Sequence, residues 1–260
     1  MYRDEFNPDL PTKILIHGYN NNAGGMKSIS DAFLVHAGYD FNVILVDWAK
    51  GAAGLLYPQK ASNVRVVGAC TGNLLQELVA QKGASLSEMH CIGTSLGAHG
   101  CGYVGRYLGG QLGRITGLDP AKQWFRTDNV EVRLDKSDAI FNDNIHTNNA
   151  GLINFGIGKS IGHVDFFPNK GKNQPPCKGK PGPNCPHMIS QAYFIQSIKA
   201  KDNCTFTAFP CDRLNDSDEG GCETCTNGVD CQRMGYFADT MPGRGTYFLR
   251  TTQNAPYCEN

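Results

Sequence analysis

Short apolar runs alternate with segments of helical periodicity through the first half of the chain. The apolar runs cover residues 13–18, 41–47, 89–92 and 114–118, and the helical segments cover residues 28–36, 62–82 and 98–108. Runs of this length that end at glycine or polar residues are typical of buried strands. The alternation favours a mostly parallel central sheet with helices on both faces. We therefore predict one α/β domain over residues 1–260, a length that suits a single large core.

The regular alternation fades after Pro120, and long segments rich in glycine, asparagine and proline follow. The most prominent are residues 142–160 and 169–186. Loops of this length within a compact domain are commonly functional. A helix over residues 187–199 and a strand over residues 245–249 are expected after them.

Eleven cysteines are unevenly distributed, and eight of them fall between Cys177 and Cys258. A loop-rich segment with little core of its own commonly depends on disulfides, so we predict a disulfide-stapled C-terminal loop region. The CxxC spacing of Cys222 and Cys225 would also suit a zinc site. Two glycosylation sequons, at Asn203 and Asn215, lie in the same segment. The cysteines and the sequons both favour a secreted, extracellular protein.

The charge balance argues against several classes of partner. Lysine plus arginine and aspartate plus glutamate each number 24, so the formal net charge is zero, and nothing predicts binding to nucleic acid. The longest apolar runs, such as residues 14–16 and 43–46, are far shorter than the roughly 20 residues that span a bilayer. No transmembrane segment is expected.

No signal peptide follows Met1, so we interpret the start of the sequence as a mature or truncated boundary.

The stretch Gly93-Thr-Ser-Leu-Gly97 is a G-x-S-x-G pattern between an expected strand and an expected helix. A serine at such a junction lies on a strained turn, and the flanking glycines avoid clashes between the strand and the helix. The backbone N–H of Leu96, at the start of the helix, would donate to a developing oxyanion. The pattern favours Ser95 as a nucleophile, with a glycine-rich turn or a phosphate cradle as the alternative.

A nucleophilic serine needs a histidine base and a carboxylate that orients the base. In this arrangement of strand and helix the chain order is serine, acid, histidine. Asp119 follows the next expected strand and would emerge at the same sheet edge as Ser95, although an aspartate before proline also suits a turn. His146, His163 and His187 all lie downstream, and spacing does not choose among them.

The loop after the first expected strand can supply a second oxyanion donor. Gly18 allows a close approach of the backbone, and the N–H of Tyr19 is the expected donor. His17 precedes Ser95 in the chain and ends a buried strand. We therefore interpret His17 as structural.

These motifs resemble those of the pancreatic lipase family, especially arthropod secreted lipases and venom-type phospholipases A1. The matching stretches run in family order and cover residues 10–19, 46–48, 92–99, 113–121, 162–169 and 185–187, with a further likeness to the arthropod branch at 255–258. The resemblance implies an α/β-hydrolase fold and a serine carboxylic ester hydrolase that acts on glycerolipids.

The resemblance also distinguishes the three histidines. The family's base belongs to a Cys-x-His signature that Cys185-Pro-His187 matches. It therefore implies the catalytic triad Ser95, Asp119 and His187. The other two downstream histidines match structural positions of the family.

A lid over the active site, closed by a disulfide between Cys177 and Cys185, is implied by the same resemblance. Only residues 178–184 lie between these cysteines, and they are Lys-Gly-Lys-Pro-Gly-Pro-Asn. A short polar lid implies an open site with weak interfacial activation. In this family short lids resemble those of phospholipases A1, which release the fatty acid of the sn-1 ester. The loop over residues 147–162 looks intermediate, so a triacylglycerol lipase without phospholipase activity is the alternative.

Further pairings are implied for the remaining cysteines. Family pairing suggests Cys211–Cys222 and Cys225–Cys231, with Cys204 and Cys258 as candidate partners and Cys70, Cys91 and Cys101 as buried thiols. Because the number of cysteines is odd, at least one is unpaired in a monomer.

Residues 130–138 resemble the structural calcium loop of the family. The resemblance implies carboxylate ligands from Asp135 and Asp138 and backbone carbonyl ligands from Val130 and Arg133. Hard oxygen donors of this kind suit Ca²⁺. A solvated charged turn without an ion is the alternative, and no cofactor is expected for the chemistry itself.

Two departures limit what the resemblance implies. The chain starts ten residues ahead of Pro11, so we expect some N-terminal strands of the family to be absent, and we expect no C-terminal β-sandwich domain. Without that domain no colipase partner is implied, and we expect a monomer that acts at a lipid–water interface. A catalytically inactive lipid-binding or yolk-type relative is a further alternative, although all three triad residues are present.

Overall fold

Nine strands form one sheet in the computed structural model of the chain, which describes residues 5–149, 153–200, 203–212, 214, 222, 224–226 and 230–259. The strands are β1 (Thr12–Ile16), β2 (Asn42–Val46), β3 (Met89–Thr94), β4 (Arg114–Leu118), β5 (Phe141–Ile145), β6 (Val164–Pro168), β7 (Thr207–Pro210), β8 (Gln232–Arg233) and β9 (Gly245–Leu249). Their order across the sheet is β2-β1-β3-β4-β5-β6-β9-β7-β8. The strands from β2 to β9 in this order pair in parallel, whereas β7 pairs antiparallel with β8 and β9.

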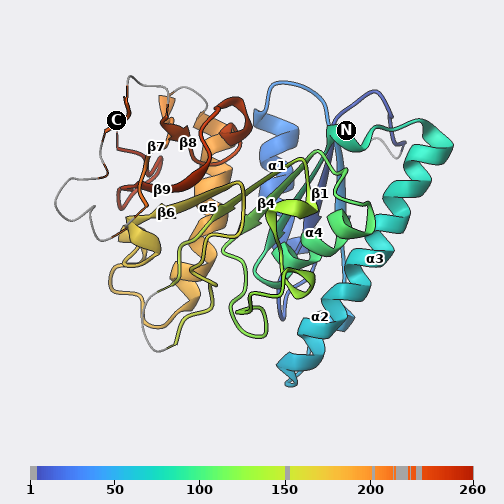
Figure 1. Cartoon of the computed structure of the whole chain (residues 1–260), viewed down its shortest axis with the longest axis horizontal. Coiled ribbons are helices and arrows are strands. Elements are labelled where there is room, and N and C mark those ends of the chain that lie inside the picture. Colours follow the sequence, from blue (N-terminus) through green and yellow to red (C-terminus); the bar gives the residue numbers. More distant parts are fainter. Residues whose placement is uncertain are drawn as a thin grey trace.

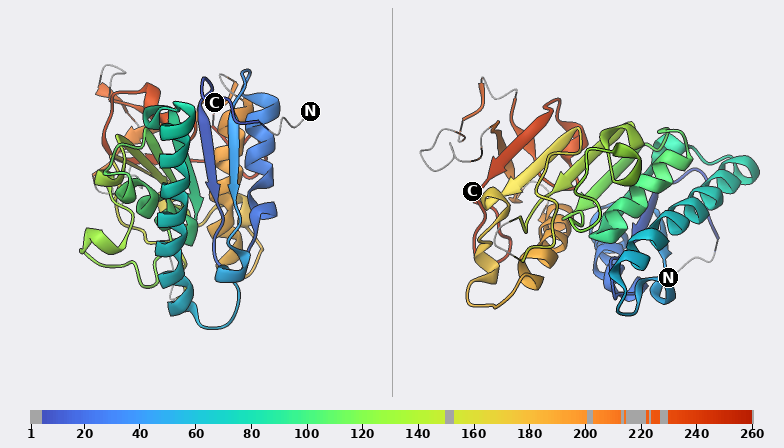
Figure 2. Two further views of the ribbon diagram at one scale, coloured as in Figure 1. Left: turned by 90° about the vertical axis from the view of Figure 1, so that its right-hand side faces the viewer. Right: turned by 60° about the horizontal axis from the view of Figure 1, so that its bottom comes forward.

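Helices cover both faces of the sheet (Figure 1). The described α-helices are α1 (Lys27–His36), α2 (Ala49–Ala52), α3 (Tyr57–Lys82), α4 (Leu96–Tyr107) and α5 (Asn184–Ala200). Helices α1 and α5 pack together on one face, and α3 and α4 pack together on the other (Figure 2). Side chains of β1 alternate between the two cores, since Ile14 and Ile16 belong to the core with α3 and α4, and Leu15 to the core with α1 and α5. The predicted mostly parallel sheet is confirmed.

Strand β5 lies where the sequence predicts the start of a long loop, so that prediction is wrong there. Its central residues Asn142, Asp143 and Asn144 are polar and fully buried. Side chains of the neighbouring strands bind them, since Oδ1 of Asp143 accepts hydrogen bonds of 2.8 Å from Nε of Arg114 and 2.9 Å from Oγ1 of Thr116. The sequence pattern hides this strand because its stabilising partners come from β4, which the periodicity of β5 alone does not reveal.

Five disulfides join ten of the cysteines. They are Cys91–Cys101, Cys177–Cys185, Cys204–Cys258, Cys211–Cys222 and Cys225–Cys231. The pairings implied for the C-terminal region are confirmed. The expectation of buried thiols is wrong, because Cys91 and Cys101 are joined and Cys70 is an exposed thiol. The described residues hold no cluster of metal-ligating side chains that would suit zinc.

Two observations bear on the location of the protein. Within the described part of the chain, every helix is too short or too polar to cross a membrane. The sequon asparagine Asn203 lies in the described region, whereas Asn215 lies outside the described residues.

Candidate active site

Ser95 occupies the turn between β3 and α4. Its φ of 57° and ψ of −117° lie in a region that residues with a side chain rarely adopt. Crowding of the backbone requires glycine on both sides: a Cβ on Gly93 would lie 2.2 Å from the Gly97 carbonyl oxygen, and a Cβ on Gly97 would lie 2.1 Å from the Ile16 carbonyl oxygen. Ser95 is partly exposed between buried neighbours. The turn therefore presents a single hydroxyl at the carboxyl edge of the sheet.

A disulfide fastens this turn. Cys91 belongs to β3 and Cys101 belongs to α4, and their Cα atoms are 5.6 Å apart. The strand before Ser95 and the helix after it are therefore covalently joined. A residue in a rarely populated backbone conformation costs of order 1–3 kcal/mol and persists only where its surroundings hold it. The disulfide supplies part of that restraint.

Asp119 follows β4 at the same edge of the sheet, and its side chain is fully buried. The carboxylate oxygen Oδ1 accepts hydrogen bonds from the N–H groups of Thr147, at 2.8 Å, and Asn148, at 3.1 Å. The other oxygen, Oδ2, lies 2.5 Å from Nδ1 of His187. A Cβ on Gly156 would lie 2.4 Å from Oδ1, so the backbone closes over the carboxylate. These contacts hold Asp119 in one orientation.

His187 lies in the first turn of α5, and its side chain is almost fully buried. The ring of Phe155 packs edge-on against the imidazole, with ring centroids 5.3 Å apart. Among the described contacts, His187 makes no direct hydrogen bond to Ser95. The start of α5 nevertheless lies against the Ser95 turn, because Nε2 of Gln191, one helical turn beyond His187, donates to Oγ1 of Thr94 at 2.9 Å.

The loop after β1 also approaches Ser95. A Cβ on Gly18 would lie 3.0 Å from Cβ and 3.6 Å from Oγ of Ser95. The N–H groups of Tyr19 and Leu96, the two predicted oxyanion donors, have no hydrogen-bond acceptor among the described residues. Two unpaired N–H groups, one beside Gly18 and one directly after Ser95, can donate to an oxyanion that forms on a substrate.

His17 supports the same loop. Its Nδ1 donates to the Gly18 carbonyl oxygen at 3.0 Å, and its Nε2 accepts from the N–H of Trp48 at 3.1 Å. The ring is fully buried, and burial lowers the pKa of His17. The imidazole is therefore neutral at physiological pH and acts as a structural bridge, as its position in the sequence predicts.

The imidazole rings of the other two downstream histidines bind groups other than Asp119. Nε2 of His146 lies 2.7 Å from Oδ1 of Asp165, and Nδ1 of His163 accepts from the N–H of Asn142 at 3.1 Å. Of the three histidines that spacing leaves open, the structure brings only His187 to Asp119.

His99 is a supporting residue that the sequence analysis misses. From α4, its Nδ1 accepts from the N–H of Leu134 at 3.0 Å, and its Nε2 donates to the carbonyl oxygen of Ala121, two residues beyond Asp119, at 2.8 Å. Burial lowers its pKa to about 3, so the ring stays neutral. Its position could have suggested this role, because His99 lies four residues after Ser95, on the first turn of a helix that packs on β4.

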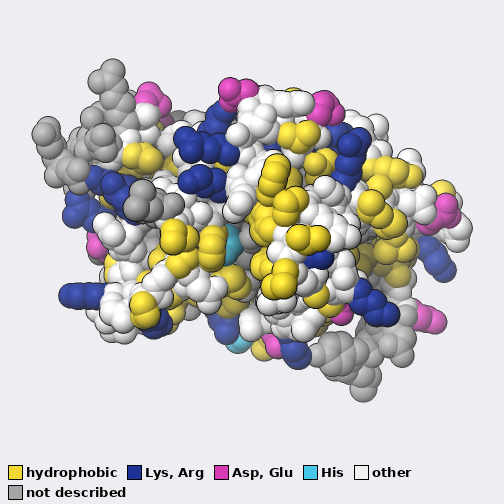
Figure 3. Space-filling view, turned by 90° about the horizontal axis from the view of Figure 1, so that it is seen from below, with side chains coloured by type: hydrophobic (Ala, Val, Ile, Leu, Met, Phe, Trp, Pro, Cys, Tyr) yellow, Lys and Arg dark blue, Asp and Glu magenta, His cyan; other side chains and the backbone are white. Residues whose placement is uncertain are grey.

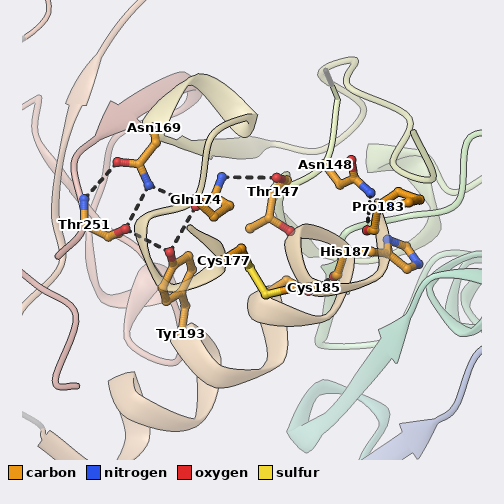
Figure 4. Close-up of a disulfide and its surroundings, with 11 residues drawn as sticks. Thr147, Asn148, Asn169, Gln174, Cys177, Pro183, Cys185, His187, Tyr193 and Thr251 are labelled. Atoms are coloured by element: carbon orange, nitrogen blue, oxygen red, sulfur yellow. Dashed lines mark hydrogen bonds between the residues drawn. A yellow bond between two sulfur atoms is a disulfide. The ribbon is translucent and has the colours of Figure 1, made fainter. Parts of the chain in front are cut away.

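The lid segment, residues 178–184, lies beside the start of α5 and is closed by the disulfide between Cys177 and Cys185 (Figure 4). All of its residues except Pro183 are exposed. Nδ2 of Asn148 donates to the Pro183 carbonyl oxygen at 2.8 Å, so the lid is tied to the loop that also binds Asp119. A cavity of about 690 Å³ opens between the lid and this loop.

The predicted calcium loop is organised around an arginine. The Arg106 guanidinium donates to the carbonyl oxygens of Val130, at 2.8 Å, and Arg133, at 3.1 Å, and to the carboxylate of Asp138, at 2.9 Å. Asp135 caps its own turn and pairs with the side chain of Arg133 at 3.1 Å. All four expected ligands therefore already bind a cationic side chain, three of them the side chain of Arg106. The residues in this arrangement do not fit a calcium ion, because the ion would have to displace Arg106.

The face that carries these residues is rich in apolar side chains. Figure 3 views the molecule from the side on which α2 lies and shows hydrophobic side chains on both sides of a histidine ring. Exposed large apolar residues of the loops at the carboxyl ends of the strands are Tyr19, Leu55, Leu56, Trp124, Ile153 and Phe155. An exposed apolar surface of this kind marks a site of contact with a protein or a lipid.

A profile described as Lipase matches residues 2–257. Pancreatic lipase-related protein 2 of Homo sapiens is 37% identical, with the alignment covering 97% of this chain and 58% of that protein. Lipase member H of Mus musculus is 39% identical, covering 84% of this chain and 51% of that protein. The chain thus spans little more than half the length of these relatives. An extracellular α/β-hydrolase from a Paenibacillus species overlaps 46% of this chain and 48% of its own, with 16% identity and a TM-score of 0.29.

Proposed function

Because the chain belongs to the lipase family, we propose that it hydrolyses carboxylic esters of glycerolipids. The observation that carries this proposal is the pairing of Asp119 with His187 at the sheet edge that also holds the strained Ser95 turn. A carboxylate that fixes one imidazole nitrogen leaves the other nitrogen to act on a nearby hydroxyl. In this proposal the hydrogen bond between Ser95 and His187 forms as substrate binds, since catalytic hydrogen bonds often tighten only in the complex.

The proposed reaction passes through an acyl-enzyme. Oγ of Ser95 attacks the ester carbonyl carbon while Nε2 of His187 takes the hydroxyl proton, and the N–H groups of Tyr19 and Leu96 donate to the oxyanion. His187 then returns the proton to the departing glycerol oxygen. Water attacks the acyl-enzyme with the same roles and releases the fatty acid. Asp119 stabilises the imidazolium through its contact with Nδ1 of His187, and no cofactor takes part.

The proposed substrate class is phospholipid, with cleavage of the sn-1 ester. The exposed, polar lid segment supports this assignment, because it leaves the site accessible without an oil interface. A triacylglycerol lipase without phospholipase activity is the competing assignment.

The intact set of Ser95, Asp119 and His187 favours an enzyme over an inactive lipid-binding relative. The five disulfides support a secreted protein, which we propose acts as a monomer without a colipase.

Replacement of the nucleophile tests the proposed reaction. In Ser95→Ala, turnover of a soluble short-chain ester should fall by roughly 10⁴-fold or more, because only oxyanion and binding contributions remain. Ser28→Ala, an exposed serine on α1, is the matched control and should retain full turnover. Equal turnover by Ser95→Ala and wild type would remove Ser95 from the mechanism.

A regiospecific assay separates the two substrate classes. The wild-type protein should release the sn-1 fatty acid from phosphatidylcholine, and the products should be resolved by which acyl chain remains on the glycerol. Cleavage of triacylglycerol alone would contradict the phospholipid assignment while leaving the ester hydrolase assignment intact.

A further inference from the structure

A second cavity, of about 640 Å³, shares Lys172 with the first, and adjacent residues of one loop line the two, Asn148 the first and Asn149 the second. Its charged lining residues are Lys122, Arg126, Lys159, Lys170 and Lys172. We call this cavity the basic pocket. None of the described residues that line it is acidic, and the amide side chains of Asn149 and Asn154 add polar groups.

The walls of the basic pocket belong to the segments that hold the catalytic pair. The N–H of Lys122 donates to the carbonyl oxygen of Phe155 at 2.7 Å, and the ring of Phe155 packs on His187. On the other wall, the N–H of Asn149 donates to the carbonyl oxygen of Gly171, between Lys170 and Lys172, at 2.8 Å. A ligand in the basic pocket would therefore lie beside the active site, on the same edge of the sheet.

The concentration of positive charge is local. The whole chain has equal numbers of basic and acidic residues, yet residues 166–198 contain Lys170, Lys172, Lys178 and Lys180 and no acidic residue. Within the described part of the pocket rim, Asp128 pairs with Lys159, and Nζ of Lys122 donates to Oδ1 of Asn154 at 2.6 Å. A concave surface lined by charges of one sign raises the local concentration of the opposite ion. The basic pocket thus favours an anionic ligand.

The surroundings of the basic pocket indicate what kind of anion it would bind. Trp124, between Lys122 and Arg126, is 61% exposed, and Ile153, next to Asn154, is 74% exposed. Basic side chains beside exposed apolar side chains match the interface of a membrane, where phosphate groups lie above the acyl chains. A guanidinium and several ammonium groups are also the side chains that bind phosphate most strongly. A soluble phosphate would use the charges but not the apolar rim.

We propose that the basic pocket binds the phosphate head group of an anionic membrane lipid and so docks the catalytic face on anionic membranes. The consequence for turnover rests on the proposed hydrolysis of glycerolipids, whereas the binding itself does not. An anchored head group would hold the enzyme on the bilayer while a neighbouring lipid enters the active site. The enzyme would then select its membrane by surface charge as well as by the ester it cleaves.

Binding to vesicles tests this proposal without turnover. The Ser95→Ala protein should bind phosphatidylcholine vesicles that contain phosphatidylglycerol at least tenfold more tightly than pure phosphatidylcholine vesicles, measured by co-sedimentation. Adding Arg126→Gln, Lys159→Gln and Lys172→Gln should weaken binding to the anionic vesicles roughly 100-fold, because each basic residue near such a surface contributes about 1 kcal/mol, or about fivefold.

A matched control removes the same charges elsewhere. Arg65→Gln, Lys82→Gln and Lys199→Gln change exposed residues of α3 and α5 and should leave the preference for anionic vesicles intact. Equal losses in the two triple variants would overturn the proposal, since the effect would then be one of net charge. Unchanged binding in the first triple variant would overturn it as well, provided that thermal unfolding shows a native fold.

A soluble competitor distinguishes the source of the phosphate. Glycerol 3-phosphate, at concentrations matched to the vesicle head groups, should leave vesicle binding nearly unchanged. Complete displacement by this competitor would show that the pocket binds a soluble phosphate ester, and the membrane assignment would be wrong. A separate assay of wild-type turnover on a soluble ester reports on the proposed reaction, so failure of one proposal is distinguishable from failure of the other.

Discussion

At the scale of single residues, the site depends on backbone positions that exclude a side chain. Gly93 and Gly97 permit β3 and α4 to cross at Ser95, and Gly18 permits the loop after β1 to approach it. The sequence predicts the role of these three glycines, because a close approach of the backbone is expected both in a G-x-S-x-G turn and at the glycine that follows the first strand. It does not predict His99, because its partners are backbone groups of Leu134 and Ala121 that only the tertiary fold brings near.

Gly18→Ala tests the proposed oxyanion-binding role of the loop after β1. The added methyl group would lie 3.0 Å from Cβ of Ser95 and from the Thr94 carbonyl oxygen, so the loop must move by a few tenths of an ångström. The Tyr19 N–H would move with it, and we expect kcat on a soluble ester to fall roughly 100-fold, as when one oxyanion donor is lost. The thermal midpoint should change little by comparison.

Gly100→Ala on α4 is the matched control. The added methyl group there would meet Cγ2 of Ile16 at 3.4 Å, which is ordinary contact, and alanine favours a helix over glycine by about 0.5–1 kcal/mol. Full activity in Gly18→Ala would contradict the assignment of this loop to oxyanion binding.

At the scale of elements, the sequence predicts the first four strands as short apolar runs and predicts α1, α3 and α4 from their helical period. The four-residue helix α2 is too short to show such a period. The sequence does not predict strand β5, because Asn142, Asp143 and Asn144 interrupt the apolar pattern although they are buried. The sequence does not predict the disulfide between Cys91 and Cys101, for a related reason. Its two cysteines lie on a strand and on a helix, and their separation of 5.6 Å between Cα atoms depends on how β3 and α4 cross, which spacing along the chain does not specify.

The cysteine pairing predicts a definite number of thiols. The protein denatured without a reductant should react with one equivalent of a thiol reagent, at Cys70, and Cys70→Ser should react with none. Three equivalents would support buried thiols at Cys91 and Cys101 instead.

Removal of the disulfide between Cys91 and Cys101 should lower the stability of the fold. In Cys91→Ala with Cys101→Ala, the free energy of unfolding, measured with a denaturant, should fall by about 3 kcal/mol, which is the loop-closure contribution expected for a loop of about ten residues.

At the scale of the whole molecule, zero net charge conceals an uneven distribution. The carboxyl edge of the sheet carries the basic pocket, while the core between the sheet and α1 and α5 encloses two cations, Arg114 and Lys13. Arg114 there pairs with Asp143 at 2.8 Å. Lys13 has no carboxylate within ion-pair distance among the described residues, and its Nζ lies over the rings of Phe33, Phe41 and Tyr236. Burial, together with the nearby Arg114, lowers the pKa of Lys13 to about 8.

This buried lysine predicts an unusual dependence of stability on pH. The pKa of Lys13 is about 8 in the folded protein and 10.5 in the unfolded chain, so between these values the unfolded state binds more protons. Stability therefore rises with pH across this window, by at most about 1.4 kcal/mol per pH unit. Unfolding by urea between pH 7 and pH 9.5 measures the effect. A Cys70→Ser background prevents thiol exchange at alkaline pH.

Lys13→Met in the same background provides the comparison. Methionine retains much of the side-chain length without the charge, so its free energy of unfolding should exceed that of the parent at pH 7 and should lack the rise above pH 8. The two curves should converge toward pH 9.5, because the parent then buries a neutral amine. Parallel curves over the whole range would show that Lys13 keeps its usual pKa, and that the aromatic rings around it compensate fully for its removal from water.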